Sequence, residues 1–124
     1  MPRAGHYVLN MIVCLAVTPD GLLGPRWGRA DRVAVVDVRD GGIESWQELD
    51  VGWGELHDLG PEGGHHARVA RFLREHAVQV VVAHHVGGGM QQMLGKMGID
   101  LHLASAGRAS DAALSALGSA HKRS

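Results

Sequence analysis

The first half of the chain alternates apolar runs with turn signals, a pattern typical of strands. Residues 8–17 form an apolar run rich in valine and isoleucine, which ends at the turn signal Thr-Pro-Asp-Gly of residues 18–21. A second run covers residues 32–38, and residues 40–42 suit a tight hairpin turn. Polar residues interleave the third run, residues 43–51, as on a half-exposed strand. We therefore predict an antiparallel meander of three strands.

The second half changes to a helical spacing of apolar positions, interrupted by short apolar runs. One of these runs has no polar alternation after Gln79, so we expect a strand that is buried on both faces. Gly98 is a natural end for the helix that precedes it. The predicted elements are, in order, a helix over residues 61–76, a strand over 78–83, a helix over 89–97, a strand over 99–104 and an alanine-rich helix over 109–117.

Helices that alternate with strands require parallel strands and right-handed crossovers. Together with the meander, this predicts an α/β fold with a five-stranded mixed sheet, in the order β-β-β-α-β-α-β-α, and helices on both faces. A chain of 124 residues is enough for one domain and too short for two. We assign residues 1–10 to a leader, 11–118 to a single cofactor-binding domain and 119–124 to a tail.

Strand directions bring distant segments to one edge of the predicted sheet. The loop after Val17, residues 51–66, the turn of residues 84–89 and residues 104–108 all fall at that edge. Ligands of open α/β sheets collect at the carboxyl ends of the parallel strands. The predicted metal ligands at this edge are His57, His65, His66, His84 and His85.

The turn itself combines two histidines with Gly87, Gly88 and Gly89, between a strand and a helix. Backbone N–H groups at such a helix start can hold an anion, such as a thiometallate or a phosphate. The alternative is a tight turn whose glycines only supply positive φ angles. Nucleotide motifs are excluded, because Gln92 breaks G-x-G-x-x-G and Met97 replaces the Ser or Thr of a P-loop.

Among the histidines we expect His85 to be the main ligand, because imidazole suits Fe, Zn, Cu and Ni. Neighbouring side chains on an extended strand point to opposite faces, so we expect His84 to face away. His65 and His66 lie in the first turn of a helix, where the dipole should keep them neutral. His57 is the weakest candidate. For all of them, packing or solvation without a ligand remains the alternative.

Other side chains at this edge add to the predicted cofactor-binding site. Met90 faces the glycine turn and carries a soft thioether, and Arg26 and Arg29 suit an anionic cluster. Trp27 either caps the site or anchors its loop. The single cysteine, Cys14, lies within an apolar strand, so we expect a buried and inert thiol.

The composition of the chain excludes several classes of partner and of metal site. The formal net charge of −1 argues against nucleic acid and against anionic membranes as partners. One cysteine excludes an internal disulfide and a Cys-based zinc or iron–sulfur site within one chain, and favours a cytoplasmic setting. The apolar run of residues 11–17 is too short to span a membrane.

Three short motifs occur in a recognisable order: Trp27-Gly28-Arg29-Ala30 in a loop, His85-Val86-Gly87 after a strand, and Lys96-Met97-Gly98-Ile99 before the last strand. In this order the chain resembles the dinitrogenase iron–molybdenum cofactor biosynthesis family. It departs from the family pattern in having Trp27 for the usual Phe and a second histidine, His84. The resemblance implies a ribonuclease H-like fold and the carriage of a metal or metal–sulfur cluster of Fe/Mo type, with Zn, Cu and Ni left open.

The leading hypothesis is therefore a small accessory protein, without catalytic activity, that carries a metal cofactor and meets a cofactor-assembly or acceptor protein. A second is a regulatory or partner-binding domain of the same fold without metal. A ribonuclease H-like nuclease is disfavoured, since its first strand would supply a carboxylate and residues 8–17 contain none. Oligomeric state is open.

Overall fold

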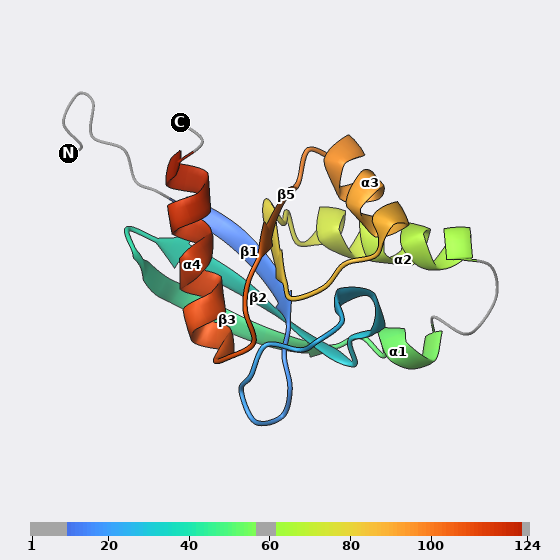
Figure 1. Cartoon of the computed structure of the whole chain (residues 1–124), viewed down its shortest axis with the longest axis horizontal. Helices are drawn as coiled ribbons and strands as arrows, with labels where there is room; N and C mark the ends of the chain where they lie inside the picture. Colours follow the sequence, from blue (N-terminus) through green and yellow to red (C-terminus); the bar gives the residue numbers. More distant parts are fainter. Residues whose placement is uncertain (1–9, 57–61, 123–124) are drawn as a thin grey trace.

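The computed structural model describes residues 10–56 and 62–122. A mixed sheet of five strands runs through the molecule in the order β3-β2-β1-β4-β5 (Figure 1). The strands are β1 (Asn10–Ala16), β2 (Arg32–Arg39), β3 (Gly42–Asp50), β4 (Val80–Ala83) and β5 (Asp100–Leu103).

The register confirms the predicted meander and the parallel half. Strand β2 pairs antiparallel with both β1 and β3, whereas β4 pairs parallel with both β1 and β5. Strand β1 is therefore central, and its Val13 lies opposite Val36 on one side and Val80 on the other. The hairpin turn is also confirmed, because Asp40 and Gly41 have φ angles of 52° and 83°.

The helices follow the prediction with differences at the short elements. They are η1 (Trp27–Arg29), α1 (Trp53–Leu56), α2 (Glu62–Glu75), α3 (Gly88–Lys96) and α4 (Ala109–Lys122). Neither η1 nor α1 was expected, because three or four residues are too few to show a helical period. Helix α4 continues past the predicted end at residue 117, so the predicted tail is helical as far as Lys122. Residues 1–9 of the predicted leader lie outside the described part of the chain.

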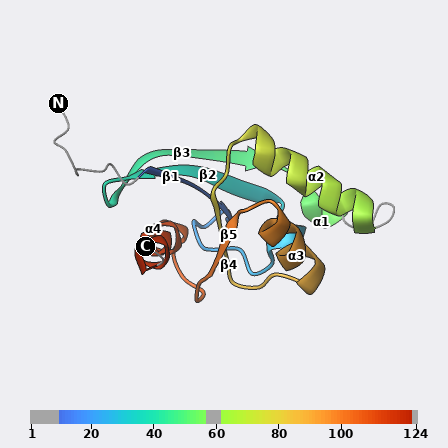
Figure 2. The ribbon, with the colours of Figure 1, turned by 90° about the horizontal axis from the view of Figure 1, so that it is seen from above.

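Helices cover both faces of the sheet, as predicted. Because strand side chains alternate, Cys14 and Val81 face α2 and α3, whereas Val13 and Val82 face α4. Figure 2 shows β4 and β5 between α4 on one side and α3 on the other. Within the described ranges, no helix is long and apolar enough to cross a membrane. The ribonuclease H-like assignment stays a prediction.

Candidate functional site

A pocket of about 590 Å³ opens where β4 ends, between η1, the start of α2 and the turn into α3. These segments meet at the right-hand end of the molecule in Figure 1. We call it the histidine pocket. Its lining residues are Pro25, Arg26, Trp27, Gly28, Arg29, His65, His66, His84, His85, Gly87, Gly88, Gly89 and Met90. Every predicted site residue is among them except His57, which lies outside the described residues.

Backbone hydrogen bonds hold the loop after β1 against the edge of the sheet where β1 and β4 end. The Gly24 amide donates to the Ala16 carbonyl oxygen at 2.9 Å, and the Trp27 amide donates to the His85 carbonyl oxygen at 3.3 Å. Gly24 approaches β1 so closely that a Cβ atom would lie 2.9 Å from the Cβ of Ala16. A glycine is therefore required at this point for the loop to reach the pocket.

Trp27 anchors the loop and lines the histidine pocket at the same time. Its side chain is 1% exposed and packs edge-on against Trp53, with ring centroids 5.2 Å apart. Its indole Nε1 is buried and has no hydrogen-bond partner in the described structure. A buried N–H group without a partner is costly, so this donor is an exception that the packing of the pocket wall leaves unsatisfied.

His65 has a structural role that the sequence did not reveal. The side chain is 1% exposed, and its Nε2 donates to the Gly28 carbonyl oxygen at 2.8 Å. Since a carbonyl can only accept, the neutral ring carries its proton on Nε2, and Nδ1 accepts from Arg68 Nη1 at 2.9 Å. Both ring nitrogens therefore take part in hydrogen bonds. In this structure His65 forms part of the pocket wall and offers no ring nitrogen to a metal ion.

Gly89 leaves room for the ring of His66. A Cβ atom at position 89 would lie 2.9 Å from His66 Cε1, whereas one at Gly87 or Gly88 would meet nothing within 4 Å. None of the three glycines has a positive φ angle. The alternative that these glycines supply positive φ angles is therefore wrong, and without side chains they leave the backbone of the turn open.

The glycines of this turn form the N-terminus of α3. The N-cap residue, Gly87, makes no side-chain capping hydrogen bond. The first N–H groups of a helix have no acceptor within the helix and attract anions. Arg26 and Arg29 add positive charge, and no described residue that lines the pocket is acidic. The histidine pocket is therefore suited to a negatively charged ligand.

His84 and His85 both line the pocket, which contradicts the expectation that His84 faces away. The reason is that β4 ends at Ala83, so the alternation of a strand does not extend to these residues. His84 Nδ1 donates to the Ala104 carbonyl oxygen at 3.1 Å, which leaves the lone pair of a neutral ring on Nε2. Many histidines that bind metals donate their other ring N–H group to a backbone carbonyl, which fixes the orientation of the ring.

The described side chains form no coordination site for a single metal ion. Among the side chains that the structure describes, no three from His, Cys, Asp or Glu are grouped to hold a metal ion. Cys14 is fully buried in β1, where burial raises the pKa of its thiol, and it does not line the pocket. The predicted burial of this thiol is confirmed.

Two supporting residues were missed from the sequence. Arg68 stands three positions after His65, a helical spacing at which side chains meet, and this spacing could have identified it. Gln91 Nε2 donates to the Val86 carbonyl oxygen at 3.1 Å and so braces the turn. No sequence signal points to that contact, because it depends on the exact path of the turn.

Comparisons with known proteins agree with this architecture. Residues 10–120 match the family model described as dinitrogenase iron-molybdenum cofactor. The orange protein from Desulfovibrio gigas, in its apo form, has a TM-score of 0.67 at 23% identity, with 89% of this chain and 88% of that chain covered.

Two further structures have the same fold. The protein PH0822 has a TM-score of 0.68 at 18% identity, with 88% of this chain and 92% of that chain covered. A protein from Methanocaldococcus jannaschii has a TM-score of 0.62 at 13% identity, with 89% and 91% covered. No curated protein matches the sequence.

Proposed function

Since the chain belongs to the dinitrogenase iron-molybdenum cofactor family, we propose that it is a small accessory protein that carries or inserts a metal cofactor. The cargo occupies the histidine pocket. The pocket's volume of about 590 Å³ suits a small cluster or a metallate rather than a single ion.

The observation that carries this proposal is the concentration of N–H donors without acceptors around the pocket. The open N-terminus of α3 supplies backbone donors at Gly88 and Gly89, and Trp27, which lines the pocket, has a buried Nε1 without a partner. Arg26 adds charge at the rim. Such donors stabilise an anion, so the preferred cargo is an anionic metal–sulfur cluster or thiometallate held through its outer atoms.

Direct coordination by histidine nitrogens is a second mode of metal binding in this pocket. His84 is the best prepared of them, because the Ala104 carbonyl fixes its ring and leaves Nε2 as the acceptor nitrogen. His85 is exposed on the same wall and His66 is half-buried opposite Gly89. Fe and Mo are the metals that the family name suggests, and imidazole also suits Zn, Cu and Ni.

We further propose that the protein has no catalytic activity of its own. Strand β1, with the sequence NMIVCLA, offers no carboxylate at the sheet centre, where a two-metal nuclease would need one. A cytoplasmic carrier that meets a cofactor-assembly or acceptor protein, and neither nucleic acid nor a membrane, fits the net charge of −1. A metal-free regulatory domain is the alternative.

Metal analysis of the native protein tests this proposal. The protein is purified anaerobically without a histidine tag, and its metal content and absorption spectrum are measured. We expect bound metal that is lost in His84→Ala and His85→Ala but retained in the control His76→Ala, because His76 follows the far end of α2. No metal in the native protein, together with no uptake of Fe, Cu, Zn or thiomolybdate, would favour the metal-free alternative.

A further inference from the structure

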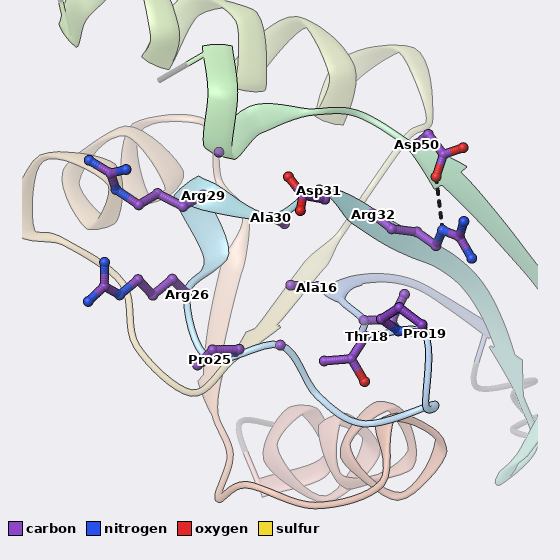
Figure 3. Close-up of a pocket in the computed structure, with 13 residues that line it drawn as sticks. Ala16, Thr18, Pro19, Pro25, Arg26, Arg29, Ala30, Asp31, Arg32 and Asp50 are labelled. Atoms are coloured by element: carbon purple, nitrogen blue, oxygen red, sulfur yellow. Dashed lines mark hydrogen bonds and ion pairs between the residues drawn. The ribbon is translucent and has the colours of Figure 1, made fainter. Parts of the chain in front are cut away.

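The two edges of the sheet, β3 and β5, differ in how well they are protected against pairing with another strand. Charged side chains and bulges commonly protect such an edge. Strand β3 carries Glu44, Glu48 and Asp50, and a register shift interrupts its pairing with β2. Arg32 pairs with Asp50 at 2.9 Å (Figure 3) and with Glu48 at 3.4 Å, so one cation serves two carboxylates. Pairing two antiparallel copies of β3 over their full length would set Glu44 opposite Glu48, and like charges in that position are destabilising.

Strand β5 lacks these protections. Its sequence, DLHL, carries a single carboxylate at Asp100 and contains neither lysine nor proline. Its register with β4 is unbroken from Asp100 to Leu103. Leu103 is 59% exposed, the largest exposed fraction among the large hydrophobic residues that the structure describes. Strand β5 is therefore the edge at which a further strand can add.

The backbone of β5 directs two of its residues toward this open edge. The amide of Asp100 donates to the Gln79 carbonyl oxygen at 3.1 Å, and the amide of Ala104 bonds to the end of β4 in the same way at 2.9 Å. In a parallel ladder, residues that bond to the neighbouring strand alternate with residues whose N–H and C=O groups point away from it. The main-chain groups of Leu101 and Leu103 therefore face outward, and no strand in the described part of the chain pairs with them.

One register between two antiparallel copies of β5 gives complementary side chains. If Leu101 lies opposite Leu101 of the second copy, then Asp100 lies opposite the second copy's His102, and the two-fold axis repeats this pair. A carboxylate accepts a hydrogen bond from an imidazole N–H group, and side chains that lie directly opposite each other interact. Asp100 and His102 share one face of β5, and the two leucines share the other, because strand side chains alternate. The edge is therefore complementary to itself in charge and in apolar surface.

We propose that two copies of the chain pair antiparallel through β5, so that their sheets continue into one another. The outward main-chain groups of the two Leu101 residues bond to each other, Leu103 is covered, and Asp100 meets His102 across the interface. Because β5 has only four residues, the interface is small, and we expect a dissociation constant on the order of 10–100 µM. This proposal does not depend on metal carriage, because the cargo of the histidine pocket plays no part in it.

Sedimentation equilibrium of the whole protein, from about 5 to about 500 µM, tests the proposal. The change His102→Asp should weaken the dimer by about tenfold, because it sets two carboxylates opposite each other. The double variant Asp100→His, His102→Asp exchanges the two partners and should restore the affinity. Gln47→Asp is the matched control, since it adds the same charge to the exposed surface of β3, and it should leave the dissociation constant unchanged.

Leu103→Pro tests the main-chain contacts separately. It removes an N–H group that faces outward and keeps every hydrogen bond between β5 and β4, so it should also weaken the dimer by about tenfold. A monomer at every concentration, a double variant as weak as His102→Asp, an unchanged dimer in Leu103→Pro, or a dimer weakened by Gln47→Asp would each overturn the proposal.

Discussion

At the scale of single residues, three histidines of the candidate site have different roles. His65 is buried and bridges Gly28 to Arg68 through both ring nitrogens. His84 has one nitrogen engaged with a backbone carbonyl, and His85 is exposed. The spacing of histidines along the chain placed the site, but the ranking made from the sequence could not include the hydrogen bonds that engage both ring nitrogens of His65.

We predict that His65→Ala lowers the free energy of unfolding by about 2–4 kcal/mol, because it removes a buried ring and leaves a carbonyl and a guanidinium without their partner. His85→Ala is the control and should change stability by less than about 0.5 kcal/mol, as exposed substitutions do. Urea denaturation measures both. Equal stabilities of the two variants would show that His65 is not the wall residue we describe.

Cys14 gives a prediction about pH. Burial raises the pKa of its thiol, so the folded protein keeps the proton that the unfolded chain loses near pH 8.5. The contribution of this group to stability is complete below that pH and is lost as the pH rises above it.

Relative to Cys14→Ala, the unmodified protein should therefore lose about 1.4 kcal/mol of unfolding free energy between pH 7 and about pH 9.5. Urea denaturation at the two pH values measures the difference. A gap between the two proteins that does not change with pH would show that the thiol ionises equally in both states.

At the scale of elements, the length of each segment decided what could be predicted. Strands β1, β2 and β3 and helices α2 and α3 follow clear apolar patterns, and they agree with the prediction to within a few residues. The short helix α1 and the single turn of η1 gave no periodic signal. They form because the buried rings of Trp53 and Trp27 pack together, a tertiary contact that no local pattern contains.

The turn into α3 supplies a matched pair of substitutions. Gly89→Ala places a Cβ 2.9 Å from His66 Cε1, whereas Gly88→Ala meets nothing within 4 Å. We expect Gly89→Ala to displace the ring of His66 and to weaken ligand binding in the histidine pocket by about tenfold, since a poorly placed group loses roughly one hydrogen bond.

In contrast, Gly88→Ala should raise stability by about 0.5–1 kcal/mol, because alanine is the better helix former. Thermal unfolding measures stability, and a titration with tetrathiomolybdate measures binding. Equal binding by the two variants would mean that the contact of Gly89 with His66 does not shape the pocket.

At the scale of the whole molecule, topology assembles the candidate site. The carboxyl end of β4, the loop after β1 and the start of α2 meet although they are far apart in the sequence, and strand directions were enough to predict that edge. The close approach of Gly54 to the loop before β2 was not predicted, because it is a packing detail outside any motif: a Cβ atom at Gly54 would lie 2.8 Å from the Arg29 carbonyl oxygen.

The histidine pocket differs in charge from the chain as a whole. Its described walls contain Arg26 and Arg29 and no carboxylate, whereas the formal net charge of the chain is −1. The charge of this pocket therefore favours an anionic cargo.

Titration of the tag-free apoprotein with tetrathiomolybdate, followed by isothermal calorimetry, tests whether the histidine pocket binds an anionic cargo. We predict saturable binding that weakens with added salt and falls by about tenfold in Trp27→Phe, because that change removes the buried Nε1 donor of a residue that lines the pocket. Trp46→Phe is the control, because its Nε1 bonds to Glu48 on β3. No saturable binding, or equal affinities of Trp27→Phe and the unmodified protein, would contradict the account.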